Sequence, residues 1–363
     1  MVESSRMAAI EARSDFTAPY NPLENRSRVL TGMRTTGELH LGHYVGALKE
    51  WKRIQDEGEF DCYFLLADVQ ALTTHSDQPE LLTESVREVV LDWISVGLDP
   101  DLNRIHFVLQ SQVPERYELS QQFLMIAKYG EVMRNPTLKE ELEKQPDATM
   151  GFMTYPVDQV ADIYMVSPTP PEPQDRLLVP VGQDQVPHLE YARELARRFN
   201  KKYGPVFVQC EALVGEVGRL VGVDGKSKMS KSLGNAISLS DDEATVNAKV
   251  RNMFTDPNRI SPDTPGETEN NPVFIYLRAF DPNMDEIAEL TERYQQGRVG
   301  DVEVKRVLAL RLNEFLDPIR QRRTRYHNAN IREIVVAGTE AARVASRPVV
   351  ESVREKMHLV YPK

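Results

Sequence analysis

Short apolar runs alternate with amphipathic stretches through the first two thirds of the chain. The runs are rich in valine, leucine and aromatic residues, which is typical of strands buried on both faces. The stretches between them carry apolar residues at the spacing of a helix. Strands are expected at 28–32, 61–67, 104–110, 176–181 and 205–210, and helices at 41–55, 79–96, 188–199 and from Pro114 onward. This alternation predicts βαβ units and a parallel sheet, in which ligands bind beyond the carboxyl ends of the strands.

Helical periodicity replaces the strand pattern from about residue 240. Helices are expected at 241–253, 272–279, 284–295, 301–330, 332–344 and 348–359. The chain is therefore predicted to hold an α/β Rossmann-type domain over 26–238 and an all-α helical domain over 239–363. Residues 1–25 mix acidic residues with proline and lack the apolar segment of a signal peptide, which predicts a mobile tail.

The turn after the first expected strand, TGMRTTGELHLGH, carries the chemistry of a nucleotide site. Gly32 and Gly37 let the chain fold tightly, and Gly42 at the head of the helix allows a flat base to approach the backbone. His40 and His43 share one helical face, so both can donate hydrogen bonds to an α-phosphate at a helix N-terminus. The alternative interpretation is two capping histidines.

The second motif is the run KMSKS at 228–232, in a stretch punctuated by glycine. Lys228 and Lys231 are compact charges that suit a polyphosphate whose leaving group accumulates negative charge. Alone, such a run is equally typical of a solvated lysine loop. Together with the histidine turn, it predicts a clamp for a nucleoside triphosphate.

Two further segments bear on a second substrate. Tyr155, Gln159 and Asp162 fall on or near one face of a helix expected at 157–165, where the carboxylate can accept a ring N–H or a hydroxyl. A solvated acid is the alternative for Asp162. In VPVGQDQ, at the end of an expected strand, Asp184 can bridge ribose hydroxyls and Gln185 can meet a small polar group.

Composition limits the other functional classes. The net charge of −11 excludes a protein that coats nucleic acid, and no DNA partner is expected. A local cluster, Arg320, Arg322, Arg323 and Arg325, is either a solvated helix face or a contact for an RNA backbone. The only two cysteines are far apart, with no zinc spacing, and no apolar stretch is long enough for a bilayer. A cytoplasmic protein without a metal site or a membrane partner is expected.

Four segments resemble, in order, motifs of the class I aminoacyl-tRNA synthetases, and within that class of the bacterial-type tryptophanyl-tRNA synthetases. They are TGMRTTGELHLGHYVGAL, TYPVDQVADI, VPVGQDQVPHLEYARELARRFN and KSKMSKS. The likeness covers the chain from about Val29 to its C-terminus. Colinear matches of this kind are far more specific than any single motif.

The resemblance implies a Rossmann domain, a helical anticodon-binding domain over 239–363 and a homodimer formed through the insertion at about 113–155. It also implies a two-step reaction. L-Tryptophan and ATP first give tryptophanyl-adenylate, and the tryptophanyl group then passes to tRNA(Trp). Mg²⁺ would enter with ATP as a substrate metal, without a dedicated protein site.

The resemblance assigns roles at the matching positions. Catalysis would depend on His40, His43, Lys228 and Lys231. ATP would contact Thr36, Gly37, His40, Gly42, His43, Gly182, Asp184, Lys228, Met229, Ser230, Lys231 and Ser232. L-Tryptophan would contact Gly32, Gln70, Tyr155, Gln159, Asp162, Val179, Val181 and Gln185, with Asp162 accepting the indole N–H.

Three positions depart from the family pattern. Thr35 replaces a proline, Gln70 stands where a histidine is common near the indole, and the stretch 162–179 is longer than usual and holds a proline-rich loop. The last two bear on the shape of the amino-acid pocket. A tyrosyl-tRNA synthetase remains an alternative, as does an auxiliary tryptophanyl form. Alternatives of other classes are a nucleotidyltransferase that makes a small adenylate without RNA, and a paralogue that binds tryptophan or a partner protein.

Overall fold

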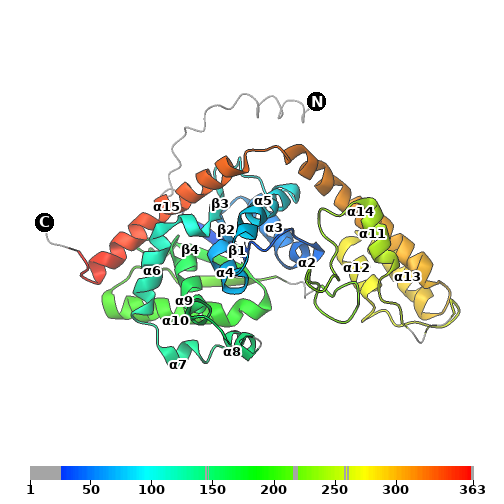
Figure 1. The fold of residues 1–363 in the computed structure, drawn as a ribbon, viewed down its shortest axis with the longest axis horizontal. Helices are drawn as coiled ribbons and strands as arrows, with labels where there is room; N and C mark the ends of the chain where they lie inside the picture. The colour runs from blue at the N-terminus through cyan, green and yellow to red at the C-terminus, as the bar shows by residue number, and fades with distance from the viewer. Residues whose placement is uncertain are drawn as a thin grey trace.

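The computed structural model describes residues 26–143, 145, 147–215, 220–256, 259 and 261–360, and the tail expected over 1–25 lies outside them. At its centre is a five-stranded parallel sheet with the order β3-β2-β1-β4-β5 (Figure 1). The strands are β1 (Ser27–Arg34), β2 (Asp61–Ala67), β3 (Ile105–Leu109), β4 (Arg176–Val181) and β5 (Cys210–Val214). The sheet confirms the predicted Rossmann-type α/β fold. Because the order reverses between β1 and β4, a ligand crevice is expected beyond their carboxyl ends.

Helices cover both faces of the sheet, as parallel sheets require. They are α2 (Leu41–His43), α3 (Lys49–Glu57), α4 (Asp68–His75), α5 (Glu80–Ser95), α6 (Pro114–Leu124), α7 (Tyr129–Val132), α8 (Pro136–Glu143), α9 (Met150–Tyr164) and α10 (Val186–Tyr203). A π-helical turn over Tyr44–Leu48 joins α2 to α3. The helix expected at 157–165 begins earlier, because Thr149 caps α9 by accepting the N–H of Phe152 at 3.2 Å.

The side chains of β2 alternate between two cores, because successive strand residues point to opposite faces. Phe64 lies in one core with Trp51 of α3 and Trp93 of α5, and its ring stacks on Trp51 at a centroid distance of 5.0 Å. Tyr63 and Leu65 lie in the other core, with apolar residues of α9 and α10. The fully buried β2 therefore packs against both layers of helices.

One expected strand is displaced. The run 205–210 was expected to be a strand, whereas β5 begins only at Cys210. Asn200, near the end of α10, accepts the N–H groups of Val206 and Phe207 at 3.0 and 3.1 Å and donates to the carbonyl of Phe207 at 2.8 Å. These backbone groups are satisfied by a side chain, so this apolar segment packs as an irregular connection before the strand.

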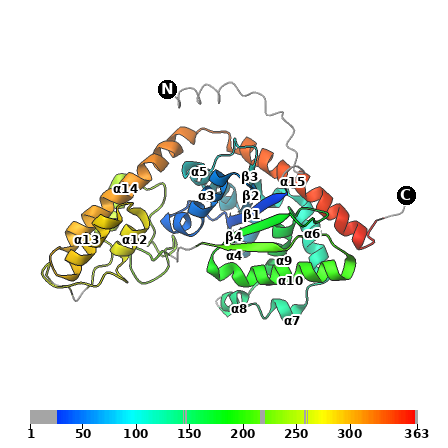
Figure 2. The same ribbon diagram turned by 180° about the vertical axis from the view of Figure 1, so that it is seen from behind.

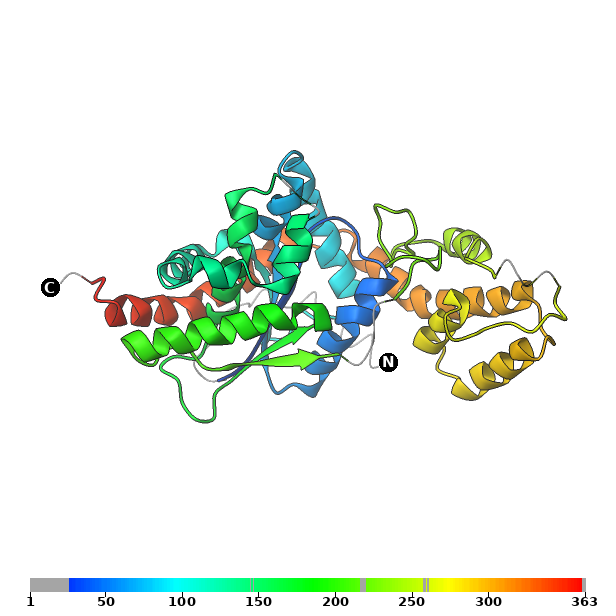
Figure 3. The same ribbon diagram turned by 90° about the horizontal axis from the view of Figure 1, so that it is seen from below.

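The helical part after the sheet contains α11 (Glu243–Arg251), α12 (Pro272–Phe280), α13 (Met284–Gln295) and α14 (Asp301–Tyr326). Figure 3 shows these helices gathered to one side of the sheet, with α14 leading back toward it. Among the residues that the structure describes, no helix is long and apolar enough to span a membrane.

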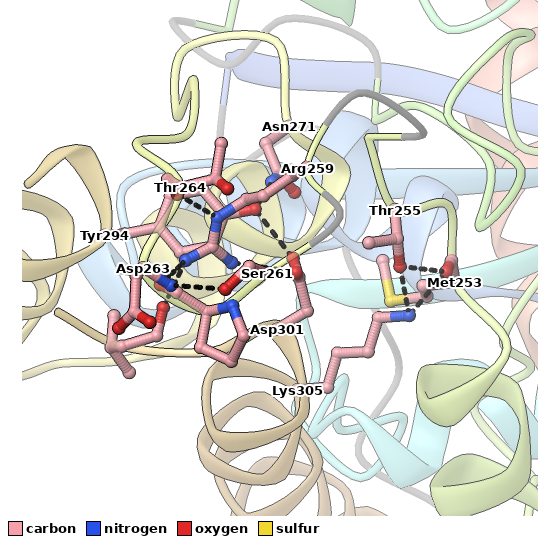
Figure 4. A network of polar contacts seen from close by, with 12 residues as sticks. Met253, Thr255, Arg259, Ser261, Asp263, Thr264, Asn271, Tyr294, Asp301 and Lys305 are labelled. Atoms are coloured by element: carbon pink, nitrogen blue, oxygen red, sulfur yellow. Dashed lines mark hydrogen bonds and ion pairs between the residues drawn. The ribbon is translucent and has the colours of Figure 1, made fainter. Parts of the chain in front are cut away.

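A polar network around Arg259 organises the loops of this helical part (Figure 4). The guanidinium lies 3.9 Å from the centroid of the Tyr294 ring, and it donates to Asp301 at 2.8 Å and to the carbonyl of Thr264 at 2.7 Å. Tyr294 donates its hydroxyl proton to the other oxygen of Asp301 at 2.7 Å. Lys305 of α14 binds the carbonyl of Met253 at 2.7 Å. Charge-assisted bonds thus connect these loops to α13 and α14.

The last helix corrects the expected division of the chain. Residues 332–344 and 348–359 were expected as two helices of the helical domain, but α15 (Ile331–Lys356) is one helix that lies along β3 and α6 (Figure 2). A Cβ at Gly338 would lie 2.4 Å from the carbonyl oxygen of Phe107 in β3, so only glycine allows this approach. Thr339 accepts the N–H of Leu109 at 3.0 Å, and α15 therefore covers the edge strand.

The proline-rich loop lies away from the ligand edge. It enters β4 at its amino end, where Asp175 forms a bidentate pair with Arg26, just before β1. Arg26 also donates to the carbonyl of Pro170 at 2.7 Å. The expectation that this loop shapes the amino-acid pocket is wrong, because ligands of such a sheet bind at the opposite, carboxyl edge.

Candidate functional site

The turn after β1 brings His40 and His43 together. His40 is 5% exposed and serves as the N-cap residue of α2, in an extended backbone conformation. The two imidazoles stack with centroids 3.8 Å apart, and the N–H of His40 donates to Nδ1 of His43 at 3.2 Å. The Nδ1 atom of His40 is buried without a hydrogen-bond partner. Such a buried polar atom is available to a ligand.

Both histidines are held neutral at pH 7. Burial, together with the charges of Lys231 and Lys228, lowers the pKa of His40 to about 4. Burial lowers the pKa of His43 to about 3, with contributions from His40 and the same two lysines. Both lysines belong to the KMSKS run, so this run lies close to the histidine turn. The histidines can therefore act as uncharged donors while the lysines supply the positive charge.

Backbone and side-chain bonds fasten the KMSKS segment to the turn. The N–H of Leu41 donates to the carbonyl of Ile237 at 2.9 Å, and the N–H of Leu239 donates to that of Leu39 at 2.9 Å. Lys231 reaches across to the carbonyl of Thr36 at 2.7 Å. Two motifs that are far apart in the sequence thus form one site.

Two glycines lie close to side chains of the site. A Cβ at Gly42 would lie 3.0 Å from the His40 ring and 3.4 Å from the sulfur of Met229, which already accepts the N–H of Gly42 at 3.3 Å. A Cβ at Gly182 would lie 2.7 Å from the carboxylate of Asp184. Both positions leave backbone open to a ligand at the carboxyl edge of the sheet.

Asn235 organises the KMSKS run, and the motif analysis did not identify it. Its Oδ1 accepts the N–H of Ser230 at 2.7 Å. Its Nδ2 donates to Asp224 at 3.1 Å, to Ser227 at 3.0 Å and to the carbonyl of Lys228 at 3.3 Å. A Gly-Asn pair reads as an ordinary turn in the sequence, so only the fold reveals that this side chain sets the shape of the loop.

A cavity of about 230 Å³ opens between α4, α9 and the start of α6. Four of the predicted amino-acid-binding residues line it: Gln70, Tyr155, Gln159 and Asp162. The Oε1 atom of Gln159 is buried without a hydrogen-bond partner, so it is available as an acceptor. The structure thus brings the predicted helix face and the departure at Gln70 into the same cavity.

Two further lining residues, Gln110 and Arg116, bind Asp162 directly. Gln110 Nε2 donates to one oxygen at 2.8 Å, and Arg116 Nε donates to the other at 2.6 Å. Burial raises the pKa of Asp162, and the Arg116 charge opposes that shift. Gln110 also accepts the N–H of Gln70 at 3.1 Å. These contacts come from the turn after β3 and from α6, so the pattern of α9 alone could not predict them.

The Tyr155 hydroxyl is fixed by two partners at the other end of the cavity. It donates to Glu141 of α8 at 2.7 Å and lies 3.2 Å from Nε2 of His188. Burial is the main reason that the pKa of Tyr155 is raised. The hydroxyl therefore stays protonated and oriented.

The other predicted ligand residues lie at the carboxyl edge but outside the lining of this cavity. Asp184 is exposed, and Gln185 donates to its carboxylate at 3.3 Å. The remaining residues belong to β1 and β4 and are Gly32, Val179 and Val181. Val179 is buried in the core.

Three of the four clustered arginines bind groups within the chain. Arg320 donates to the carbonyl of Asp241 at 2.7 Å, and Arg322 donates to the carbonyl of Ser95 at 2.5 Å. Arg323 pairs with acidic residues of α5. Arg325 is exposed. The guanidinium groups of Arg322 and Arg323 therefore join α14 to α5 of the α/β part.

Comparison with known proteins defines the class. The family model described as "tRNA synthetases class I (W and Y)" matches residues 22–317. The chain therefore belongs to the class I tRNA synthetases of the tryptophan and tyrosine group.

Within this family, the chain is similar to several individual proteins named for tryptophan. The chain is 46% identical over 338 residues to a tryptophan–tRNA ligase of Treponema pallidum, covering 92% of this chain and 97% of that protein. It is 42% identical over 345 residues to that of Chlamydia caviae, covering 93% and 97%. Among solved structures, it is similar to tryptophanyl-tRNA synthetase from Campylobacter jejuni complexed with ADP and tryptophan. That match has a TM-score of 0.77 and 30% identity and covers 91% of this chain and 99% of that one.

Proposed function

We propose that this protein activates L-tryptophan with ATP and transfers the tryptophanyl group to tRNA(Trp). The observation that carries the proposal is the site in which the lysine loop is bonded to the histidine turn, beside a cavity that contains Asp162. The relatives named tryptophan–tRNA ligase, at 42% and 46% identity, favour tryptophan over tyrosine as the amino acid.

In the first step, a carboxylate oxygen of tryptophan attacks the α-phosphorus of ATP, and the bond from that phosphorus to the pyrophosphate oxygen breaks. ATP enters as its Mg²⁺ complex, so the metal belongs to the substrate. The neutral His40 and His43 would donate hydrogen bonds to the α-phosphate oxygens, while Lys228 and Lys231 would balance the charge that accumulates on pyrophosphate. No side chain has to act as a nucleophile, because positioning and charge stabilisation suffice.

On the amino-acid side, Asp162 would accept the indole N–H, and its pairs with Gln110 and Arg116 would hold the carboxylate in place. Tyr155 and Gln185 would hold the ammonium group, and Asp184 with Gly182 would receive the ribose. A buried carboxylate that has lost its ring N–H partner is costly, so analogues without that group should be rejected without an editing domain.

Exposed side chains support a proposal for the partners of this protein. Exposed apolar side chains gather on α6 and α9 and in the segments between them: Tyr117, Met125, Tyr129 and Met150. A face of this kind supports a homodimer formed through the region 113–155, because isolated monomers rarely expose such clusters. The helices after residue 240 would receive the anticodon arm of the tRNA.

The exchange of labelled pyrophosphate into ATP tests this function. It is measured separately in the presence of each of the twenty amino acids. Exchange with tryptophan alone is expected, followed by charging of tRNA(Trp). Exchange that depends on tyrosine would overturn the specificity. The absence of exchange with any amino acid would favour a protein that binds tryptophan or a partner without activating it.

A further inference from the structure

One face of α5 carries polar groups that receive the end of α14. Glu88, Asp92 and Ser95 lie on successive turns of α5, and Arg322 and Arg323 of α14 bind them. Figure 1 shows the end of α14 passing beside α5. Arg323 contacts both Glu88 and Asp92, so one guanidinium joins two carboxylates. This contact connects the helical part to the catalytic part of the chain.

Asp92 binds the catalytic turn with its other oxygen. Asp92 is fully buried, and its Oδ2 accepts the N–H of Leu39 at 2.7 Å, while Oδ1 pairs with Arg323. Leu39 is the residue immediately before His40 and is itself 2% exposed. A hydrogen bond that a buried N–H donates to a charged carboxylate is stronger and geometrically stricter than a hydrogen bond between two neutral groups. Asp92 therefore fixes the backbone at the point where the two-histidine turn begins.

Helix α14 also contacts the segment that binds the other side of Leu39. The carbonyl of Leu39 accepts the N–H of Leu239, in the segment that follows the KMSKS run. Arg320 of α14 donates to the carbonyl of Asp241, two residues further on, at 2.7 Å. Leu39 is thus bonded on one side to Asp92, which Arg323 contacts, and on the other side to Leu239, two residues before the carbonyl that Arg320 contacts.

We propose that Asp92 and Arg323 are positioning residues for His40, and that they make the geometry of the catalytic turn depend on the docking of α14 against α5. The proposal rests on the function proposed above. The Arg323 guanidinium favours the charged form of the buried Asp92 carboxylate against the effect of burial, and this carboxylate accepts the N–H of Leu39. Without the guanidinium, burial and the neighbouring Glu38 and Glu88 favour the protonated acid, which accepts the N–H less strongly.

The decisive variants are Arg323→Gln, Arg323→Lys and Asp92→Asn in the full chain, assayed by tryptophan-dependent ATP–pyrophosphate exchange. This assay contains no RNA, so a residue that only contacts tRNA leaves it unchanged. Arg323→Gln is expected to lower kcat about tenfold or more while the KM for tryptophan changes less than about twofold, because displaced catalytic groups cost rate. Arg323→Lys should recover part of the loss, because it restores the charge without the two-pronged geometry.

The matched control is Arg87→Gln. Arg87 also joins α5 to α14, through the carbonyl of His327 at 2.6 Å, but it does not touch Asp92. Its kcat is expected to stay near that of the unmodified protein. The double variant Arg323→Gln/Asp92→Asn should lose no more activity than the more impaired single variant, because both act on one bond.

Three results would overturn the proposal. They are an unchanged kcat in Arg323→Gln, an equal loss in Arg87→Gln, and independent multiplication of the two single effects in the double variant. If Asp92→Asn does not fold, as judged by thermal unfolding, the Arg323 and Arg87 variants decide alone. A lack of exchange in the unmodified protein would instead refute the proposed function, so the two failures are distinguishable.

Discussion

At the scale of single residues, the site combines two uncharged imidazoles that can donate hydrogen bonds with two lysines that supply positive charge. His40 and His43 have pKa values of about 4 and 3, so they remain neutral donors throughout the physiological range. Lys231 is attached to the turn through the carbonyl of Thr36, which sets its charge next to the histidines before any substrate binds. Charges fixed in advance stabilise a transition state without the cost of reorganisation.

Replacing Lys231 tests this arrangement. Lys231→Ala is expected to slow adenylate formation by about a hundredfold, since a preorganised charge near the leaving group acts mainly in the transition state. The dissociation constant for tryptophan, measured by calorimetry, should change little. Lys226→Ala is the control, because Lys226 is an exposed lysine of the same loop. Equal losses in rate and in tryptophan affinity would contradict the assigned role.

Four buried histidines make the stability of the fold dependent on pH. Burial lowers the pKa of His40 and His188 to about 4 and that of His43 and His106 to about 3. The unfolded chain therefore takes up protons first as the pH falls below about 6.5, and stability is lost from there down to about pH 3 to 4.

At pH 5 each histidine removes about 2 kcal/mol of the stability present at pH 7. Asp92 acts in the opposite direction, because burial raises its pKa to about 7, and it offsets roughly one histidine. The melting temperature is expected to fall by about 5 °C or more between pH 7 and pH 5, measured by calorimetry. A melting temperature that stays constant over this interval would contradict the neutral state of these side chains.

At the scale of elements, the contact between α15 and β3 depends on a stripe of small residues. Gly338→Val would place a side chain against the backbone of Phe107 and is expected to destabilise the fold by about 3 kcal/mol. Denaturant unfolding measures the change. The neighbouring Ala337→Val is the control, because Ala337 is exposed. Similar free energies of unfolding for both variants would show that α15 does not pack as described.

Elements were predictable where their own residues determine them. The run at 61–67 matches β2, and 176–181 matches β4, because continuous apolar runs between turns leave little choice. The partner of α15 was not predictable, since periodicity shows which face of a helix is apolar but not what covers it. The run at 205–210 was misread because a side chain of the preceding helix, Asn200, satisfies its backbone.

The same limit applies to the site. His40, His43, Lys228 and Lys231 were predictable because each pair lies within a few residues and carries a recognisable chemistry. Asn235 and Gln110 were not, because their roles consist of bonds to other segments. The intramolecular pairs of Arg323 were not predictable for the same reason, since its acidic partners are far away in sequence.

At the scale of the whole molecule, the exposed apolar face of the region 113–155 predicts a dimer. Met125→Asp is expected to convert dimers to monomers, because it places a charge in an apolar interface, and light scattering measures the mass. The control is Val302→Asp, which changes an apolar side chain that is 84% exposed on the helical part. A dimer that persists in Met125→Asp, or dissociates equally in Val302→Asp, would contradict this location of the interface.

The position of α15 has a consequence for synthesis of the chain. All five strands have been synthesised once residue 214 is added, yet the open edge of β3 stays uncovered until α15 emerges from the ribosome. The helices between β5 and α15 can form earlier, because their contacts are local in sequence. The part encoded first is therefore completed last, and a nascent chain that stops before α15 presents a bare strand edge prone to aggregation.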